Sequence, residues 1–345
     1  MMEKTDSQYC FRHLSGEDIY LFTLRNTKGT EVCITNYGAI ITSFKIKSPD
    51  GNISNIVLGF DKVEDYLSDE YLAGYPYFGA AIGRYANRIK NGEFSIDGNK
   101  YILKKNKLTD HLHGGDQGFD KKVWSVNANS DKNLSLSYKS SDGEEGYPGN
   151  LATEIRFELT DDDELIYEFI AKTDKPTVVN LTHHSYFNLN NGKGTIGDHL
   201  VKISSGSILE QDENFVVTGK ALPIINTMYD FKTDRRIDYN WNAKDGYDQT
   251  YVIETADSPA PVAEAYSKKS GIRLQVFTSE PVVHFYTGKW IPFLNGKSSR
   301  NYEPFSGFCF ETHKHPNAVN IPHFPDTVLR PGQTYYTKTK YKIIS

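Results

Sequence analysis

The chain has 345 residues, of which 38% are hydrophobic and 24% are charged, a composition typical of a folded globular protein rather than a disordered or fibrous one. Its 39 basic and 44 acidic residues leave a formal net charge of −5, which provides no cationic surface for nucleic acid or for an anionic membrane. A small neutral partner suits this charge better.

The cysteines, Cys10, Cys33 and Cys309, are too few and too widely spaced for a disulfide framework or a zinc site. We therefore expect a reducing, cytoplasmic location. The N-terminal sequence MMEKTDSQYC lacks the apolar segment of a signal peptide, and no stretch approaches the roughly 20 apolar residues that span a bilayer. The sequence thus predicts no membrane association.

Hydrophobic residues alternate with polar ones along much of the chain, as they do in half-buried β-strands. Asp-Gly pairs at 50–51, 97–98 and 142–143 separate such runs and predict tight hairpin turns, whose central residues need positive φ. The best helical candidate is the short segment 62–72. The clearest alternating runs are Leu134, Leu136 and Tyr138; Ile155, Phe157 and Leu159; and Leu165, Tyr167 and Phe169.

This pattern predicts an all-β chain of antiparallel hairpins with few short helices. No parallel strand–helix–strand alternation, low-complexity linker or fixed-period repeat marks a boundary along the sequence. We therefore expect residues 1–345 to form a single domain. The 23 Tyr and 19 Phe fit strands, and aromatic residues also line sugar-binding clefts.

Polar side chains gather among glycines and aromatics in five segments, and loops at strand ends often carry function. Taken alone, most of these segments are equally well explained as surface loops or turns. In an extended stretch, the adjacent His183 and His184 must point to opposite faces, so only one of them can enter a given cleft. The segments are 83–89, 111–115, 180–189, 246–249 and 309–313.

Two of these segments carry carboxylates that invite an explanation. Glu311 lies between the apolar Phe308 and Phe310 on one side and Thr312 on the other, and a buried charge needs a partner or a chemical role. Asp248 follows an aromatic residue. A glycoside hydrolase needs two carboxylates, which Asp248 and Glu311 would supply, but that function leaves the histidines without a role.

Close histidine pairs at 111/113, 183/184 and 313/315 raise the possibility of a metal site. Alternate residues of a strand share a face, so the pairs 111/113 and 313/315 can each chelate. A ligand set also needs a third and a fourth group that converge on the same point, and the sequence does not identify them. We therefore predict no metal site and no cofactor.

Short motifs then follow one another along the chain in a fixed order. They are Asn36-Tyr37-Gly38-Ala39, 83–89, Leu112-His113-Gly114-Gly115, 180–189, Gly246-Tyr247-Asp248, Phe285-Tyr286-Thr287-Gly288, Phe310-Glu311-Thr312, Phe324-Pro325-Asp326 and Leu329-Arg330-Pro331-Gly332. In this order the sequence resembles the aldose 1-epimerases, also called galactose mutarotases, from about residue 10 to residue 343. The resemblance implies a large antiparallel β-sandwich, the galactose mutarotase-like supersandwich, with a sugar cleft across one face.

The resemblance also implies roles for individual residues. His184, inside the Asn-Leu-Thr-x-His-Ser-Tyr-Phe motif, matches the family's catalytic acid, and Glu311 matches its base. The residues implied to bind the sugar's oxygens are Asn87, Arg88, His113 and Asp248.

Three positions depart from the family pattern. His183 stands where Asn is common, Gln249 where His is common, and His284 where Gln is common. The family's Gln contacts the sugar, so we place His284 among the substrate-binding residues and expect it to affect the preference for particular hydroxyl groups. None of the three is the implied acid or base.

An acid and a base suffice for exchanging the anomers of an aldose. The base takes the proton of the C1 hydroxyl while the acid protonates the ring oxygen, and closure of the ring reverses both transfers. We therefore expect a cofactor-independent aldose 1-epimerase that acts on a free aldohexose such as galactose or glucose, as a monomer or a homodimer. The alternatives are a non-catalytic sugar-binding module and an epimerase for phosphorylated hexoses.

Overall fold

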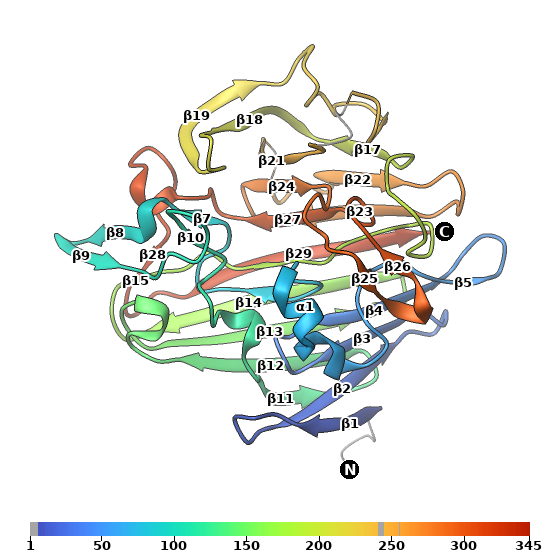
Figure 1. Cartoon of the computed structure of the whole chain (residues 1–345), viewed down its shortest axis with the longest axis horizontal. Helices are drawn as coiled ribbons and strands as arrows, with labels where there is room; N and C mark the ends of the chain where they lie inside the picture. The colour runs from blue at the N-terminus through green and yellow to red at the C-terminus, as the bar shows by residue number, and fades with distance from the viewer. Residues whose placement is uncertain (1–5, 241–244, 255) are drawn as a thin grey trace.

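The computed structural model of the chain describes residues 6–240, 245–254 and 256–345. Within these ranges the regular structure consists almost entirely of β-strands, and their pairings are antiparallel (Figure 1). The only α-helix of the described part is α1 (Asp69–Gly74). The prediction of an all-β chain with few short helices is confirmed.

The largest sheet has nine strands and runs through the middle of the molecule (Figure 1). Side chains alternate strictly along β13, where residues at every second position are buried. This is the period of two that the sequence shows around Ile155 and Leu165, and those strands are confirmed. In spatial order the strands are β11 (Ser125–Asn129), β12 (Asn133–Ser140), β13 (Leu151–Leu159), β14 (Glu164–Thr173), β29 (Tyr335–Ile344), β23 (Arg273–Thr278), β22 (Ala263–Tyr266), β17 (Leu200–Ile203) and β20 (Arg235–Arg236).

Two five-stranded sheets pack against this large sheet through one hydrophobic core. The core joins side chains such as Phe22 of the first sheet, Phe157 of the large sheet and Phe310 of the second. The first sheet holds β1 (Ser7–Arg12), β2 (Asp18–Arg25), β3 (Glu31–Thr35), β4 (Ile41–Lys47) and β5 (Ile53–Asn55). The second holds β19 (Val217–Pro223), β18 (Ser205–Gln211), β21 (Asp248–Ile253), β24 (Val282–Tyr286) and β27 (Cys309–His313).

Short ladders and single turns of 3-10 helix connect the sheets. The paired short strands are β8 (Glu93–Ile96) with β9 (Asn99–Ile102), β7 (Arg88–Ile89) with β10 (His111–Leu112), β6 (Ala81–Ile82) with β16 (Thr182–His183), β15 (Thr177–Val178) with β28 (Val328–Leu329), and β25 (Leu294–Asn295) with β26 (Asn301–Tyr302). The 3-10 turns are Val63–Leu67, Lys90–Gly92, Phe119–Lys121, Glu144–Gly146, Lys297–Ser299 and Ala318–Asn320.

Two local predictions need correction. The segment 62–72 is not one helix, because Ser68 is extended and caps α1, so that a 3-10 turn ends before it and α1 begins after it. The Asp-Gly pair at 142–143 does not make a tight hairpin. Gly143 has the expected positive φ of 86°, but a 3-10 turn follows it and lengthens the connection between β12 and β13. The pair at 97–98 does join β8 directly to β9, with positive φ at both residues.

None of the helices in the described ranges is both long enough and apolar enough to span a membrane.

Arg84 is a buried cation that ties several loops together. Its guanidinium donates to the backbone carbonyls of Ser140 and Ser141 at 3.0 and 2.8 Å and to that of Pro148 at 2.9 Å. Its Nε donates to the hydroxyl of Ser140 at 2.8 Å. Since buried carbonyl groups need donors, Arg84 satisfies the turn that connects β12 to β13.

We expect Arg84→Met to lower the free energy of unfolding by about 3 kcal/mol or more, because several buried carbonyl oxygens lose their donors. Chemical denaturation followed by tryptophan fluorescence measures the change. The control is Arg88→Met, a nearby and only half-buried arginine, for which we expect a change below about 1 kcal/mol. Equal losses for the two variants would contradict the structural role of Arg84.

Candidate active site

A pocket lies over the face of the second five-stranded sheet that points away from the core. On β27, Phe310 and Thr312 face the core, where the Thr312 hydroxyl lies 2.6 Å from that of Thr339. Glu311 lies between them and points to the opposite face because strand residues alternate. Every residue that the sequence implied for catalysis or sugar binding lines this pocket: His184, Glu311, Asn87, Arg88, His113, Asp248 and His284.

His184 and His183 point in opposite directions, as predicted for neighbours in an extended segment. The Nε2 atom of His183 lies 3.1 Å from the carbonyl oxygen of Ala39, and its ring packs against Tyr167 in the core. The ring of His184 enters the pocket, stacked between Tyr77 and Tyr186. The aromatic rings on both sides hold the imidazole in one orientation.

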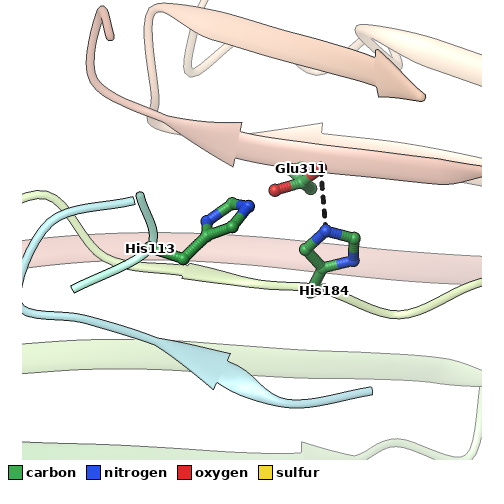
Figure 2. Close-up of side chains that lie close together, drawn as sticks. All are labelled: His113, His184 and Glu311. Atoms are coloured by element: carbon green, nitrogen blue, oxygen red, sulfur yellow. Dashed lines mark ion pairs between the residues drawn. The ribbon is translucent and has the colours of Figure 1, made fainter. Parts of the chain in front are cut away.

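Glu311 and His184 face each other in the pocket (Figure 2). His184 Nε2 lies 3.4 Å from Glu311 Oε1, and the two residues are 3% and 2% exposed. Glu311 Oε2 has no hydrogen-bond partner within the described part of the chain. Because burial disfavours charge, it raises the pKa of Glu311 to about 7 and lowers the pKa of His184 to about 3. Burial therefore favours the neutral imidazole of His184 and the protonated carboxyl of Glu311.

His113 reaches the same point from another part of the chain (Figure 2). It follows β10, where Leu112 pairs with Arg88 of β7, and its positive φ of 51° turns the side chain into the pocket. His111, two residues earlier, points elsewhere and bonds the hydroxyl of Tyr147 at 2.7 Å. A Cβ atom at Gly114 would lie 1.9 Å from the carbonyl oxygen of Gly83. The absence of a side chain at Gly114 therefore makes room for the backbone at Gly83, not for a ligand.

The tautomer of neutral His113 follows from one hydrogen bond. Its Nδ1 accepts the backbone N–H of Asn87 at 3.2 Å, so the ring proton sits on Nε2. Burial lowers the pKa of His113 well below its ordinary value, which keeps the ring neutral. His113 therefore presents an N–H donor to whatever enters the pocket.

His113, His184 and Glu311 also form the three-residue cluster that a metal ion would require, with their ligand atoms within 4.8 Å of one another. The sequence did not predict this set, because it indicated only pairs of histidines close together in the chain. A histidine ligand gives its lone pair to the metal and donates its other N–H outward. His113 has the opposite arrangement, since its outer nitrogen accepts a hydrogen bond. The tautomer thus suits a proton donor rather than a metal ligand.

Asp248 and His284 form the second carboxyl–imidazole pair of the pocket. His284 Nε2 lies 2.9 Å from Asp248 Oδ1, and His284 Nδ1 lies 2.8 Å from the hydroxyl of Thr250. Burial alone would raise the pKa of Asp248, but the hydrogen bond and charge of His284 outweigh it and hold this pKa below its ordinary value. Burial likewise lowers the pKa of His284, and Asp248 outweighs that effect and raises it. Near neutral pH the pair therefore favours a carboxylate and an imidazolium.

Asn87 and Arg88 complete the polar lining. Asn87 has a positive φ of 62°, and its side-chain oxygen accepts the backbone N–H of Arg88 at 2.8 Å. The guanidinium of Arg88 lies 5.3 Å from the ring centre of Phe215, a cation–π contact. The side-chain amide of Asn87 and the guanidinium of Arg88 both supply hydrogen-bond donors at the pocket.

The pocket also contains residues that the sequence did not single out. Trp290, Tyr286 and Lys107 line it, and Trp290 stays 58% exposed. Tyr286 belongs to the Phe285-Tyr286-Thr287-Gly288 motif, for which no individual role was implied, and Lys107 and Trp290 lie outside every motif and polar segment. Tyr75 and Tyr77 also line the pocket. Tyr77 has a positive φ of 59°, and its ring lies 4.8 Å from that of His113 within the pocket lining.

Comparison with known proteins shows similarity over nearly the whole chain. The pattern of the aldose 1-epimerase family matches residues 20–342. A human protein named galactose mutarotase is 40% identical over 318 residues, which are 90% of each chain. The Escherichia coli aldose 1-epimerase is 33% identical over 342 residues, which are 96% of each chain.

Solved structures agree with this similarity. An aldose epimerase homologue from Caenorhabditis elegans superposes with a TM-score of 0.88 at 29% identity, over 94% of this chain and 98% of that one. Galactose 1-epimerase from Lactobacillus acidophilus superposes with a TM-score of 0.84 at 25% identity, over 99% of each chain. The predicted mutarotase-like sandwich is therefore confirmed. With the family pattern matched almost from end to end, the chain belongs to the aldose 1-epimerase family.

Proposed function

We propose that this protein is a mutarotase that interconverts the α and β anomers of a free aldohexose such as galactose or glucose, without a cofactor. The observation that supports this proposal most directly is the buried acid–base pair, in which His184 Nε2 and Glu311 Oε1 lie 3.4 Å apart at the pocket. The names of the relatives, galactose mutarotase and aldose 1-epimerase, support the same reaction and substrate class.

In the proposed reaction, the Glu311 carboxylate takes the proton of the C1 hydroxyl and His184 protonates the ring oxygen. The bond between C1 and the ring oxygen breaks, the C1–C2 bond rotates, and closure on the other carbonyl face returns both protons. Each group must therefore both give and take a proton during one turnover. A carboxyl group whose pKa is about 7 suits this exchange at neutral pH, because neither of its forms is costly.

The pair needs one transferable proton, which belongs to the pair rather than to either residue. Burial favours Glu311 as the holder of this proton in the free protein, since it raises the pKa of Glu311 and lowers that of His184. Transfer across the 3.4 Å contact produces the carboxylate and imidazolium that ring opening uses. Binding of a hydroxylated sugar supplies hydrogen bonds that stabilise these charges.

The remaining polar groups suit the binding of a neutral polyol. His113 Nε2–H, Asn87 and Arg88 are donors, and Asp248 is an acceptor for a sugar hydroxyl. Tyr75, Tyr77 and Trp290 add aromatic surface at the pocket. Such a mixture of a few placed polar groups on aromatic walls is typical of small-molecule sites.

The catalytic pair is tested by polarimetry of freshly dissolved α-galactose and α-glucose. We expect Glu311→Gln and His184→Gln each to lower kcat by about 10²- to 10⁴-fold, the usual contribution of a general acid or base. The matched control is His323→Gln, because His323 bonds the carbonyl of Gly219 outside the pocket. Wild-type rates for either pocket variant would refute its proposed role, and sugar binding without any acceleration by the wild type would favour a non-catalytic binding module.

The substrate class is tested by comparing galactose with glucose 6-phosphate. Arg88 and Lys107 are the arginine and lysine side chains that line the described pocket, and the two carboxylates Asp248 and Glu311 line it as well. A phosphate dianion needs additional basic groups. We therefore expect kcat/KM for the phosphorylated sugar to be at most about one tenth of that for galactose. A higher kcat/KM for glucose 6-phosphate than for galactose would instead identify an epimerase of phosphorylated hexoses.

We also infer that residues 1–345 act as one domain, since the pocket draws side chains from Tyr75 to Glu311. The cytoplasmic location and the state as a monomer or homodimer stay predictions. Size-exclusion chromatography with light scattering measures the latter.

A further inference from the structure

His284 lines the pocket, yet both of its ring nitrogens are already bonded to protein groups. Nε2 lies 2.9 Å from Asp248 Oδ1, and Nδ1 lies 2.8 Å from the hydroxyl of Thr250. An imidazole has only two hydrogen-bonding positions. No position therefore remains on the ring for a sugar hydroxyl while these bonds are in place.

The register of the sheet produces this arrangement. Thr250 of β21, His284 of β24 and Glu311 of β27 are direct cross-strand partners, so their side chains share the pocket face in one row. Asp248 lies two residues before Thr250 and therefore on the same face. His284 is thus held between two residues of one strand, with Glu311 on its other side.

Only part of this chain of hydrogen bonds belongs to the pocket surface. Asp248 and His284 line the pocket, whereas Thr250 is fully buried behind them and does not. The charged groups that act on His284 are Asp248, Glu311 and Arg88. The neighbouring His113, His184 and His313 all have lowered pKa values and stay neutral near pH 7.

We propose that His284 is a positioning residue, which holds the Asp248 carboxylate in place for a sugar hydroxyl through a hydrogen-bonded chain that starts at Thr250. This inference rests on the proposed function, because Asp248 is taken as the sugar ligand. Thr250 orients the imidazole, the imidazole orients and neutralises the carboxylate, and the carboxylate meets the substrate. Specificity for a hydroxyl position thus depends on a side chain that never touches the sugar.

Thr250→Val tests the buried end of the chain. It preserves the shape of the side chain and removes the hydroxyl, so we expect KM for galactose to rise about three- to tenfold, with kcat within about twofold of wild type. The matched control is Thr153→Val, since Thr153 is also buried in a strand but its hydroxyl has no hydrogen-bond partner in the described residues. If both variants behave alike, the chain has no role and the proposal is overturned.

His284 itself is tested with two substitutions. His284→Leu leaves Asp248 without its donor, so we expect KM to rise more than about tenfold, whereas the amide of His284→Gln can still donate to Asp248 and keep KM within about threefold of wild type. In the double variant Thr250→Val/His284→Leu, the chain is already broken, so we expect no further rise beyond His284→Leu alone. Additive effects would mean that Thr250 does not act through His284, and a His284→Gln variant as impaired as His284→Leu would mean that donation to Asp248 is not the role of His284; either result overturns the proposal.

Histidine NMR titration of the sugar-free protein supplies a readout that does not depend on turnover. We expect the His284 imidazole to titrate at higher pH than those of His113 and His184, and this pH to fall in Asp248→Asn. An unchanged His284 titration in Asp248→Asn would overturn the proposed contact even where mutarotation is normal.

Absence of mutarotation in the wild type would instead refute the proposed function. The NMR titration would then still decide whether the hydrogen-bonded chain from Thr250 to Asp248 exists. Thermal unfolding shows whether each variant is folded. If His284→Leu does not fold, Thr250→Val and the NMR titration still test the proposal.

Discussion

The site depends on the burial of β27 between the hydrophobic core and the pocket. Phe310 and Thr312 fix one face of this strand against the large sheet, and the period of two then forces Glu311 to the other face. Every residue of β27 is buried, so the carboxylate is placed where water cannot fully solvate it. The raised pKa of Glu311 is therefore a result of the sandwich architecture rather than of a special local sequence.

Much of this arrangement could be predicted from the sequence because it follows from local periodicity. Alternation around Ile155 and Leu165 identified strands of the central sheet, and the same rule separated His184 in the pocket from His183 in the core. The ordered family motifs added what periodicity lacks, namely which polar residues belong together. Each residue implied by these motifs for catalysis or sugar binding lines one pocket, although these residues are spread along the chain from Asn87 to Glu311.

The sequence could not reveal features that depend on a backbone partner or on contacts between distant segments. The proton of His113 is fixed by the backbone N–H of Asn87, which no side-chain pattern records. Arg84 and Arg88 lie in the same motif, but carbonyls from a remote turn bury the first, and the second reaches the pocket. The helix expected at 62–72 is interrupted because the Ser68 side chain accepts a backbone N–H and restarts the chain as a new helix.

Tyr77, Asn87 and His113 all enter the pocket from backbone with positive φ, a conformation that costs about 1 kcal/mol or more for each non-glycine residue. Packing of the surrounding sheets offsets this conformational cost when the chain folds, before any sugar binds. The walls of the site are therefore preorganised, and little conformational entropy is lost at the moment of binding. A pocket of this kind tolerates rapid exchange of substrate and product, since neither arrival nor departure requires the loops to order or to melt.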